Sequence, residues 1–318
     1  MKKFMFTLAL IFLFTSVFTG GTRAYFRSRS DSPPGCAVLR SKRPFMPIEN
    51  VLFFLPFQLS KIYDHYLEEL SHRYEVFRNQ NPDMTFDLAI ALVNAGVDLE
   101  SYYDVQFAPN PYCTAVLINH NFSLPTQWMP SDLVPIGGGH MLREEAARHF
   151  NLMRKAMISE GLSIYVAHSF RSYYEQSYLF NRAVNLHGRA SAQRQFARPG
   201  HSEHNAGLAV DILHRERTGP LSAMNFQHSR EFQWLLQNAH EFGFILRYPE
   251  AYTHFHRFIF EPWHWRFVGV EIATEMHDSG ISTFEEYFGR FLAQAPAVMP
   301  PSALCTLQCQ INVIPVIS

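Results

Sequence analysis

The sequence predicts an α+β fold in which a small antiparallel sheet is flanked by helices. Helical and strand-like segments follow one another without the regular spacing of βαβ units, which argues against a parallel sheet. Residues 208–212 alternate in polarity as a half-buried strand does, with Leu208 and Val210 on one face and Asp211 on the other. A chain of 318 residues with 47% hydrophobic content can also bury a real core.

The first elements are expected to be helices. Apolar residues recur at helical spacing from residue 60 to 77, and a second, shorter helix is expected from Thr85 to Asn94, closed by Gly96. We assign these helices to an N-terminal helical part, residues 49–110, which packs on a larger part, residues 111–295. The larger part is expected to open with a turn and an apolar strand within residues 110–119.

The larger part then alternates between helices and strands. Three glycines at residues 137–139 predict a hinge or tight turn, because they lack the Lys-Ser/Thr of a phosphate loop and the spacing of a dinucleotide site. Ser172 and Glu175 form a predicted capping box that opens a helix, which places Arg171 just before that helix. The expected elements are helix 141–160, strand 163–167, helix 172–188, helix 229–242, strand 244–247 and helix 267–277.

Two segments offer ligands for a metal ion. His204 and Asp211 are joined by a plausible turn, and His264 follows about fifty residues later with Glu261 three residues before it. One histidine and one aspartate at this spacing would mean little in a chain with sixteen histidines. Two imidazoles and a carboxylate, with an open fourth position for water and a spare glutamate, are the groups that a hydrolytic zinc centre requires.

These residues resemble the signature of the VanY-type D-alanyl-D-alanine carboxypeptidases, zinc enzymes that trim the peptide stem of bacterial peptidoglycan. The similarity runs from about Asn81 to Phe288, and it implies the D-Ala-D-Ala metallopeptidase or hedgehog-like fold with the zinc site on the sheet. The similar segments are Asn110-Pro111, residues 115–119, 130–134 and 136–138, Phe170–Tyr173 with Gln176, Ser202–Asp211, and Glu261–Arg266.

The resemblance also implies a role for each site residue. The chain departs from the family pattern at His168–Phe170 and at Asn205-Ala206, which puts substrate preference in doubt without removing a ligand or the base. Peptide hydrolysis needs an activated water, a carboxylate that carries its proton and a cation for the developing oxyanion. The implied residues are His204, Asp211 and His264 as zinc ligands, Glu261 as general base, Arg171 as the group that polarises the scissile carbonyl, and Ser202 with Gln176 as carboxylate-binding groups.

The expected activity is therefore that of a zinc D,D-carboxypeptidase acting on peptidoglycan stem peptides. An L,D-carboxypeptidase acting on tetrapeptide stems is the alternative within the same class of enzyme. A non-catalytic, zinc-stabilised module that binds the cell wall is the alternative from another class. Glu261 and Arg171 argue against that module, because binding alone needs neither a base beside the metal nor a cation at the carbonyl.

The N-terminus predicts export. Residues 1–24 combine a basic start, an uncharged stretch over residues 4–21 and small residues near Ala24, which is the pattern of a signal peptide. The same stretch is just long enough to span a bilayer, so a retained N-terminal anchor is the alternative. Residues 25–48 are expected to form a linker and residues 296–318 a C-terminal tail. The expected location is the periplasm, the cell envelope or the extracellular space.

The remaining features limit partners and secondary roles. With 27 basic and 28 acidic side chains, the chain lacks the basic field of nucleic-acid-binding proteins. Four cysteines outside the signal permit disulfides in any of three connectivities. Glu203 either orients a ligand histidine or faces solvent. The four cysteines are Cys36, Cys113, Cys305 and Cys309. His168, His201, His254 and His256 are expected to be exposed or hydrogen-bonded structural histidines, and the alternative is that they support a ligand or face the substrate.

Overall fold

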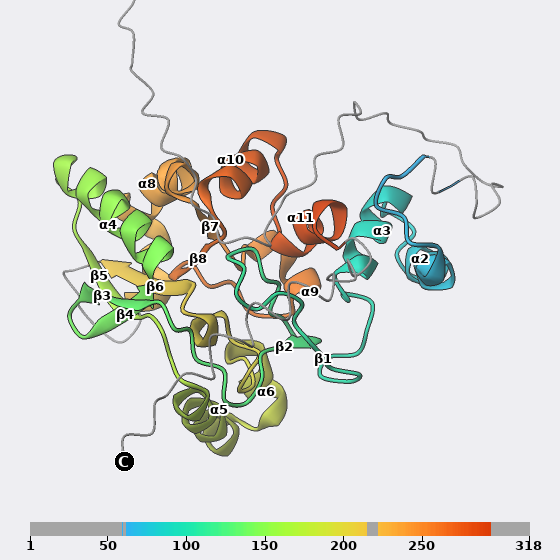
Figure 1. Ribbon diagram of the computed structural model, residues 1–318, viewed down its shortest axis with the longest axis horizontal. Coiled ribbons are helices and arrows are strands. Elements are labelled where there is room, and N and C mark those ends of the chain that lie inside the picture. Colours follow the sequence, from blue (N-terminus) through green and yellow to red (C-terminus); the bar gives the residue numbers. More distant parts are fainter. Residues whose placement is uncertain (1–58, 60–61, 215–221, 294–318) are drawn as a thin grey trace, which may run out of the picture. The chain divides into compact units, whose positions relative to one another are not determined.

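The computed structural model describes residues 59, 62–214 and 222–293, and all of them belong to one compact unit. The predicted α+β class is confirmed: a four-stranded antiparallel sheet, in the order β5-β6-β8-β7, lies among helices (Figure 1). The predicted signal or anchor, the linker and the C-terminal tail lie outside the described residues. Within the described ranges, no helix combines the length and the apolar character needed to cross a bilayer.

The N-terminal helices are α2 (Ser71–Gln80) and α3 (Phe86–Asn94). The predicted second helix is confirmed, and the Thr85 side chain caps it by accepting a hydrogen bond from the Leu88 N–H. The first predicted helix began too early, because the chain turns before a 3₁₀ segment at Glu68–Leu70. That turn buries Tyr66 in the same cluster as Tyr74, so the apolar spacing reflects one shared core and not one continuous helix.

The predicted strand within residues 110–119 is wrong. The structure has turns and irregular backbone there, followed by the short strand β2 (Phe122–Ser123), which pairs with β1 (Gln106–Phe107). The carbonyls of Thr114 and Val116 each accept a hydrogen bond from Arg266 Nη2 at 2.8 Å. A guanidinium therefore satisfies buried backbone that a neighbouring strand would otherwise pair.

The three glycines form the turn of a hairpin between β3 (Leu133–Gly137) and β4 (His140–Arg143), as predicted. Helix α4 (Glu144–Ser159) follows and lies beside this hairpin. It begins later than predicted, because residues 140–143 pair with β3. Its predicted apolar face is buried from Ala146 to Met157.

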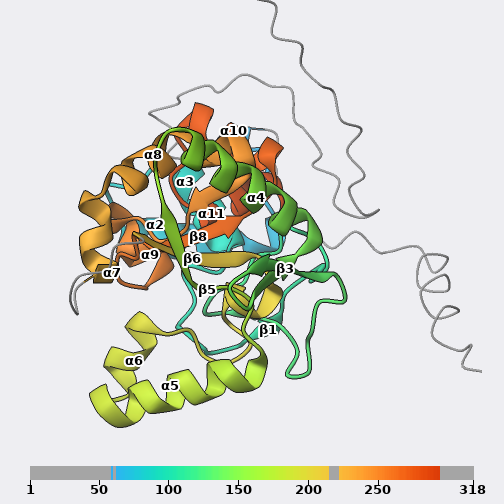
Figure 2. The same ribbon diagram turned by 90° about the vertical axis from the view of Figure 1, so that its left-hand side faces the viewer.

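Strand β5 (Ile164–His168) leads into helix α5 (Tyr173–His187), whose predicted capping box is present. The Ser172 side chain accepts from the Glu175 N–H, and the Glu175 carboxylate accepts from the Ser172 N–H. Helix α6 (Arg189–Gln195) lies beside α5 (Figure 2).

The other strands of the central sheet are β6 (Ala209–His214), β7 (Phe244–Leu246) and β8 (His264–Phe267). Strand β6 is where the half-buried prediction fails, since its residues are buried on both faces up to Leu213. Val210 and Ile212 enter the main core, whereas Asp211 faces a pocket whose walls shield it from bulk water. The predicted alternation of the two faces is correct.

The remaining helices complete the C-terminal half. The predicted helix 229–242 is α8 with a 3₁₀ turn after it, and the predicted helix 267–277 begins too early because Phe267 ends β8. An unpredicted last helix, α11, packs against α3 (Figure 1). The bounds are α7 Ser222–Asn225, α8 Arg230–Asn238, α9 Thr253–His256, α10 Val270–Ser279 and α11 Phe284–Phe291.

Cys113 is disulfide-bonded. Cys36, Cys305 and Cys309 lie outside the described residues, so the choice among the three possible disulfide connectivities is not made.

Candidate metal centre

A turn and a pair of strands bring the three predicted ligands together. His204 lies in the 3₁₀ turn Glu203–Ala206, and Gly207 follows with a φ of 67°, a left-handed conformation that redirects the chain into β6. Asp211 on β6 lies directly opposite His264, the first residue of β8. Directly opposed residues of antiparallel strands point to the same face of the sheet, so Asp211 and His264 meet there.

The ligand atoms converge on one point. Asp211 Oδ1 lies 3.3 Å from His204 Nε2 and 3.2 Å from His264 Nδ1, and the three atoms are all within 4.8 Å of one another. Ligand atoms placed about 2.0–2.2 Å from a tetrahedral zinc ion are about 3.3–3.6 Å apart. The two short separations therefore fit an ion of this size.

The hydrogen-bonding state of these atoms also fits a cation. In the part of the chain that the structure describes, His204 Nε2 and Asp211 Oδ1 are buried and lack hydrogen-bond partners of good geometry. Buried polar atoms are costly unless they are paired. An ion between them would satisfy both.

Each ligand histidine is held in one orientation by its other ring nitrogen. His204 Nδ1 lies 2.7 Å from the Ser169 carbonyl oxygen, and His264 Nε2 lies 3.3 Å from Glu203 Oε2. Both oxygens can only accept, so each of these nitrogens carries the proton and the lone pair of the other faces the ion. Glu203 thus contacts a ligand histidine and does not face solvent, which decides between the two predicted alternatives.

The site sets the charge of its ligands. Burial alone would raise the pKa of Asp211, but His204 and His264 hold that pKa well below its usual value. Burial, reinforced by the charge of Arg171, lowers the pKa of His204 to about 4. Burial opposes a charge on His264 as well, but its close contacts with the carboxylates of Asp211 and Glu203 outweigh this and raise its pKa to about 9. The carboxylates around His264 therefore favour a positive charge at this position, which a bound cation would also supply.

Glu261 lies beside the ligands without joining them. Its Oε2 is 3.8 Å from His264 Nδ1, and its backbone N–H donates to the Tyr248 carbonyl oxygen. Burial raises the pKa of Glu261 to about 8, against the opposing charge of His264. A carboxyl group that holds a proton this strongly next to the ligands is suited to proton transfer.

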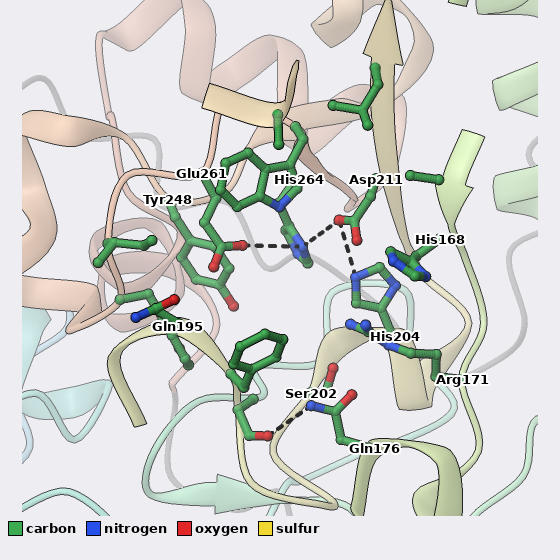
Figure 3. A pocket seen from close by; sticks show the side chains of 18 of the residues that line it. His168, Arg171, Gln176, Gln195, Ser202, His204, Asp211, Tyr248, Glu261 and His264 are labelled. Carbon is green, nitrogen blue, oxygen red and sulfur yellow. Dashed lines mark hydrogen bonds and ion pairs between the residues drawn. The ribbon is translucent and has the colours of Figure 1, made fainter. Parts of the chain in front are cut away.

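A cleft of about 480 Å³ opens over these groups, and all seven predicted site residues line it. In Figure 3, Glu261 and Tyr248 lie on one side of the His264 ring, and Asp211 and His168 lie on the other. The outer walls are partly apolar. The other lining residues include Tyr165, Gln195, Phe196, Phe258 and Trp263, and of these only Trp263 lies in a segment that the sequence analysis named as similar to the family.

Arg171 occupies the predicted junction between β5 and α5. Its N–H donates to the His204 carbonyl oxygen at 3.1 Å, and its own carbonyl accepts from Asn205 Nδ2 at 2.7 Å. These two bonds tie the arginine to the turn that carries a ligand. Burial lowers the pKa of Arg171, yet a guanidinium remains charged. A half-buried cation in the cleft is suited to stabilising negative charge there.

Ser202 and Gln176 lie together on the cleft wall below the His204 ring (Figure 3). Gln176 Nε2 donates to the Ala197 carbonyl oxygen at 2.8 Å. Binding a carboxylate requires donors, and the Ser202 hydroxyl and the amide of Gln176 are donor groups that line this wall. The carboxylate-binding role of both residues stays a prediction.

Two lining residues add to the sequence analysis. His168 is exposed, as one of the expected alternatives has it, and it lies on β5 opposite Asp211, where it lines the cleft (Figure 3). Tyr248 was not predicted at all: it is buried, its ring centroid lies 4.9 Å from that of His264, and burial raises its pKa well above its usual value. Each of these two residues directly follows a predicted strand, 163–167 or 244–247. Their position at a strand end was the signal in the sequence that could have marked them as candidate site residues.

The other three histidines fit the structural interpretation. His201 Nδ1 lies 2.8 Å from the Asn119 carbonyl oxygen, and His256 is buried with its Nε2 3.0 Å from the Pro249 carbonyl oxygen. His254 is exposed.

Comparisons with known proteins agree with this geometry. Residues 139–270 match the family model "VanY: D-alanyl-D-alanine carboxypeptidase". The chain is 33% identical over 200 residues to YodJ of Bacillus subtilis, a protein named as a carboxypeptidase, covering 60% of this chain and 72% of YodJ. It is 32% identical to the bifunctional D-Ala-D-Ala dipeptidase and carboxypeptidase VanXYC of Enterococcus gallinarum, covering 57% of this chain and 96% of that protein.

A solved structure shares the fold. The LD-carboxypeptidase LdcB is 32% identical, with a TM-score of 0.54, covering 59% of this chain and 91% of that chain. A D-alanyl-D-alanine carboxypeptidase of Enterococcus faecalis is 29% identical, and the matched region spans 54% of this chain and 64% of that protein.

Proposed function

Since the chain belongs to the VanY family of D-alanyl-D-alanine carboxypeptidases, we propose that it is a zinc-dependent D,D-carboxypeptidase that removes the terminal D-alanine of peptidoglycan stem peptides. The observation that supports this most directly is the convergence of His204, Asp211 and His264 in a cleft that also holds Glu261 and Arg171. A metal site that served only structure would not need the last two residues.

Zinc fits the donor set. Two imidazole nitrogens and one carboxylate oxygen are its usual ligands in hydrolytic sites that keep a fourth position open. His204, Asp211 and His264 would hold the ion. When bound, zinc supplies a Lewis acid and lowers the pKa of a water in the fourth position to about 7.

Glu261 serves as the general base in this proposal. It is buried within reach of the ligands, so it can take a proton from the attacking water and return it to the amine of the leaving D-alanine. Arg171 faces the same space and stabilises the negative charge that develops on the scissile carbonyl oxygen. The backbone hydrogen bonds of Arg171 to the turn that carries His204 hold the arginine at a fixed position relative to that metal ligand.

Recognition of a free C-terminus is assigned to Ser202 and Gln176. Amidating the terminal D-alanine of the substrate removes its charge and one acceptor oxygen, which leaves donors of the site unpaired. We expect the amide to be hydrolysed far more slowly than the acid. Equal rates on both substrates, or preferential cleavage of internal crosslinks, would show an endopeptidase and overturn this assignment.

An L,D-carboxypeptidase is the second candidate, and the similarity to LdcB favours it. Incubation of the purified protein with pentapeptide and tetrapeptide stems, followed by mass spectrometry, separates the two activities. Loss of D-alanine from the pentapeptide alone supports the D,D activity, whereas loss from the tetrapeptide alone supports the L,D activity. A protein that binds zinc but hydrolyses neither stem would be a non-catalytic binding module.

We also propose that the protein acts outside the cytoplasm. This proposal depends on the basic, apolar and small-residue pattern of residues 1–24 and on the extracytoplasmic position of peptidoglycan. Sequencing the N-terminus of the protein recovered from the cell envelope tests it. A mature chain that begins near residue 25 indicates a cleaved signal, an intact N-terminus in the membrane fraction indicates an anchor, and recovery from the cytosol refutes export.

A further inference from the structure

A buried chain of ion pairs joins helix α11 to the metal ligand His264. Glu285 of α11 accepts two hydrogen bonds from Arg247, at 2.8 and 2.6 Å, in the bidentate arrangement. Arg247 Nε donates to Glu203 Oε1 at 2.8 Å, and Glu203 Oε2 accepts from His264 Nε2. The side chains of Glu285, Arg247 and Glu203 are at most 1% exposed.

Among the two arginines and two glutamates of this network, the charges balance only when Glu285 is included. Glu203 also lies 2.7 Å from Nη1 of the buried Arg266, so two guanidinium groups face one carboxylate at that point. Glu285 supplies the second negative charge through Arg247. Without it, the network would carry an uncompensated positive charge close to a site that binds a cation, and both arginines would compete with His264 for Glu203.

Helix α11 is itself held firmly in place. Gly289 packs so closely on α3 that an added Cβ would lie 1.8 Å from the Ala91 carbonyl oxygen, and the Gly289 carbonyl accepts from Asn94 Nδ2 at 3.0 Å. Arg290 pairs with Asp87 of α3. The carboxylate of Glu285 therefore reaches Arg247 from a fixed support that lies beyond the family-matched residues 139–270.

We propose that Glu285 is a positioning residue of the metal centre. Glu285 pairs with both terminal nitrogens of Arg247, so that the two arginines contact only Oε1 of Glu203 and Oε2 remains to hold His264, with Nδ1 of His264 facing the ion. The inference rests on the proposed function in one respect, because it requires that His204, Asp211 and His264 bind zinc.

The test is the zinc affinity of the full-length, metal-free protein, measured by competition with a chromophoric chelator. Outer-shell partners of metal ligands typically contribute about 10- to 100-fold to affinity. We expect Glu203→Gln to lose affinity within that range and Glu285→Gln to lose about 10-fold, at its lower end. Glu286→Gln is the matched control: it makes the same substitution at the next position of α11, where the carboxylate pairs with Arg290, and should bind zinc as the wild type does.

The melting temperature of each metal-free variant separates positioning from stability. A Glu285→Gln protein that melts earlier but binds zinc with wild-type affinity would overturn the proposal. If that variant does not fold, Arg247→Lys is measured instead, because lysine keeps the charge and loses the bidentate geometry. Wild-type zinc affinity in folded Arg247→Lys would also overturn it. A wild-type protein that binds no zinc would refute the proposed function itself.

Discussion

Replacing Glu261 by glutamine is the sharpest test of the proposed chemistry. The substitution keeps the size and the burial of the side chain but removes its ability to accept a proton. Glu261 lies 3.8 Å from His264 Nδ1 and outside the set of three converging ligand atoms, so the metal should remain bound. General base catalysis contributes about 10²- to 10⁴-fold, and we expect a loss in kcat of about 10³-fold, in the middle of that range.

The assay is the initial rate of D-alanine release from a stem pentapeptide, together with the zinc content of the same preparation. A loss of 10³-fold in rate corresponds to about 4 kcal/mol in the activation free energy. Glu250→Gln, an identical change at an exposed position, is the control and should keep full activity. Zinc lost in parallel with activity would make Glu261 a ligand. Wild-type kcat in Glu261→Gln would show that another group is the base.

Three further predictions concern the metal, the cation and a buried histidine. Removing zinc with a chelator should abolish hydrolysis and lower the melting temperature, and zinc added at 100 times its Kd should restore both, with about 2.7 kcal/mol of stabilisation by calorimetry. Arg171→Met should lower kcat by about 10²- to 10³-fold with little change in KM, as steady-state kinetics would show, because it removes a stabiliser of developing charge. Burial, with the charge of Arg257 next in effect, lowers the pKa of His120 to about 3, so between its usual pKa of 6.5 and about 3 the unfolded chain binds a proton that the folded chain does not. The free energy of unfolding should therefore fall as the pH drops through this window, by at most about 1.4 kcal/mol per pH unit from this residue. Denaturation curves of His120→Phe, measured at several pH values, should show an unfolding free energy that depends less steeply on pH.

The placement of His204 and Asp211 could be predicted because it is mostly local, whereas His264 lies about fifty residues further along and was assigned from the motif that contains it. The turn after His204 needs a residue that tolerates a left-handed backbone, and Gly207 supplies it. The alternation along β6 fixes which face carries Asp211. Arg171 could be placed for a similar reason, since the capping box fixes where helix α5 begins. Each of these signals lies within a few residues of the side chain that it positions.

Features that depend on packing against distant segments could not be predicted. The apolar run before Asn119 has the composition of a strand, but its backbone is paired by Arg266, a residue more than a hundred positions away. Phe267 fits the apolar pattern of a helix but continues β8, because the partner strand extends that far. In both cases a non-local hydrogen-bond partner decided the local conformation.

The ion-pair network behind the metal centre, formed by Glu203, Arg247 and Glu285, depends most strongly on packing between distant segments. Glu203 and Arg247 are 44 residues apart, Arg247 and Glu285 are 38 apart, and a chain with 27 basic and 28 acidic residues offers many other pairings. No spacing rule selects these three, because what selects them is burial: a charge at 0–1% exposure is tolerated only with a partner. The ligands can thus be read from a motif, whereas the groups that hold the ligands in place follow from the tertiary structure. Substitutions at Glu285 should for this reason weaken the metal centre even though no motif includes that residue.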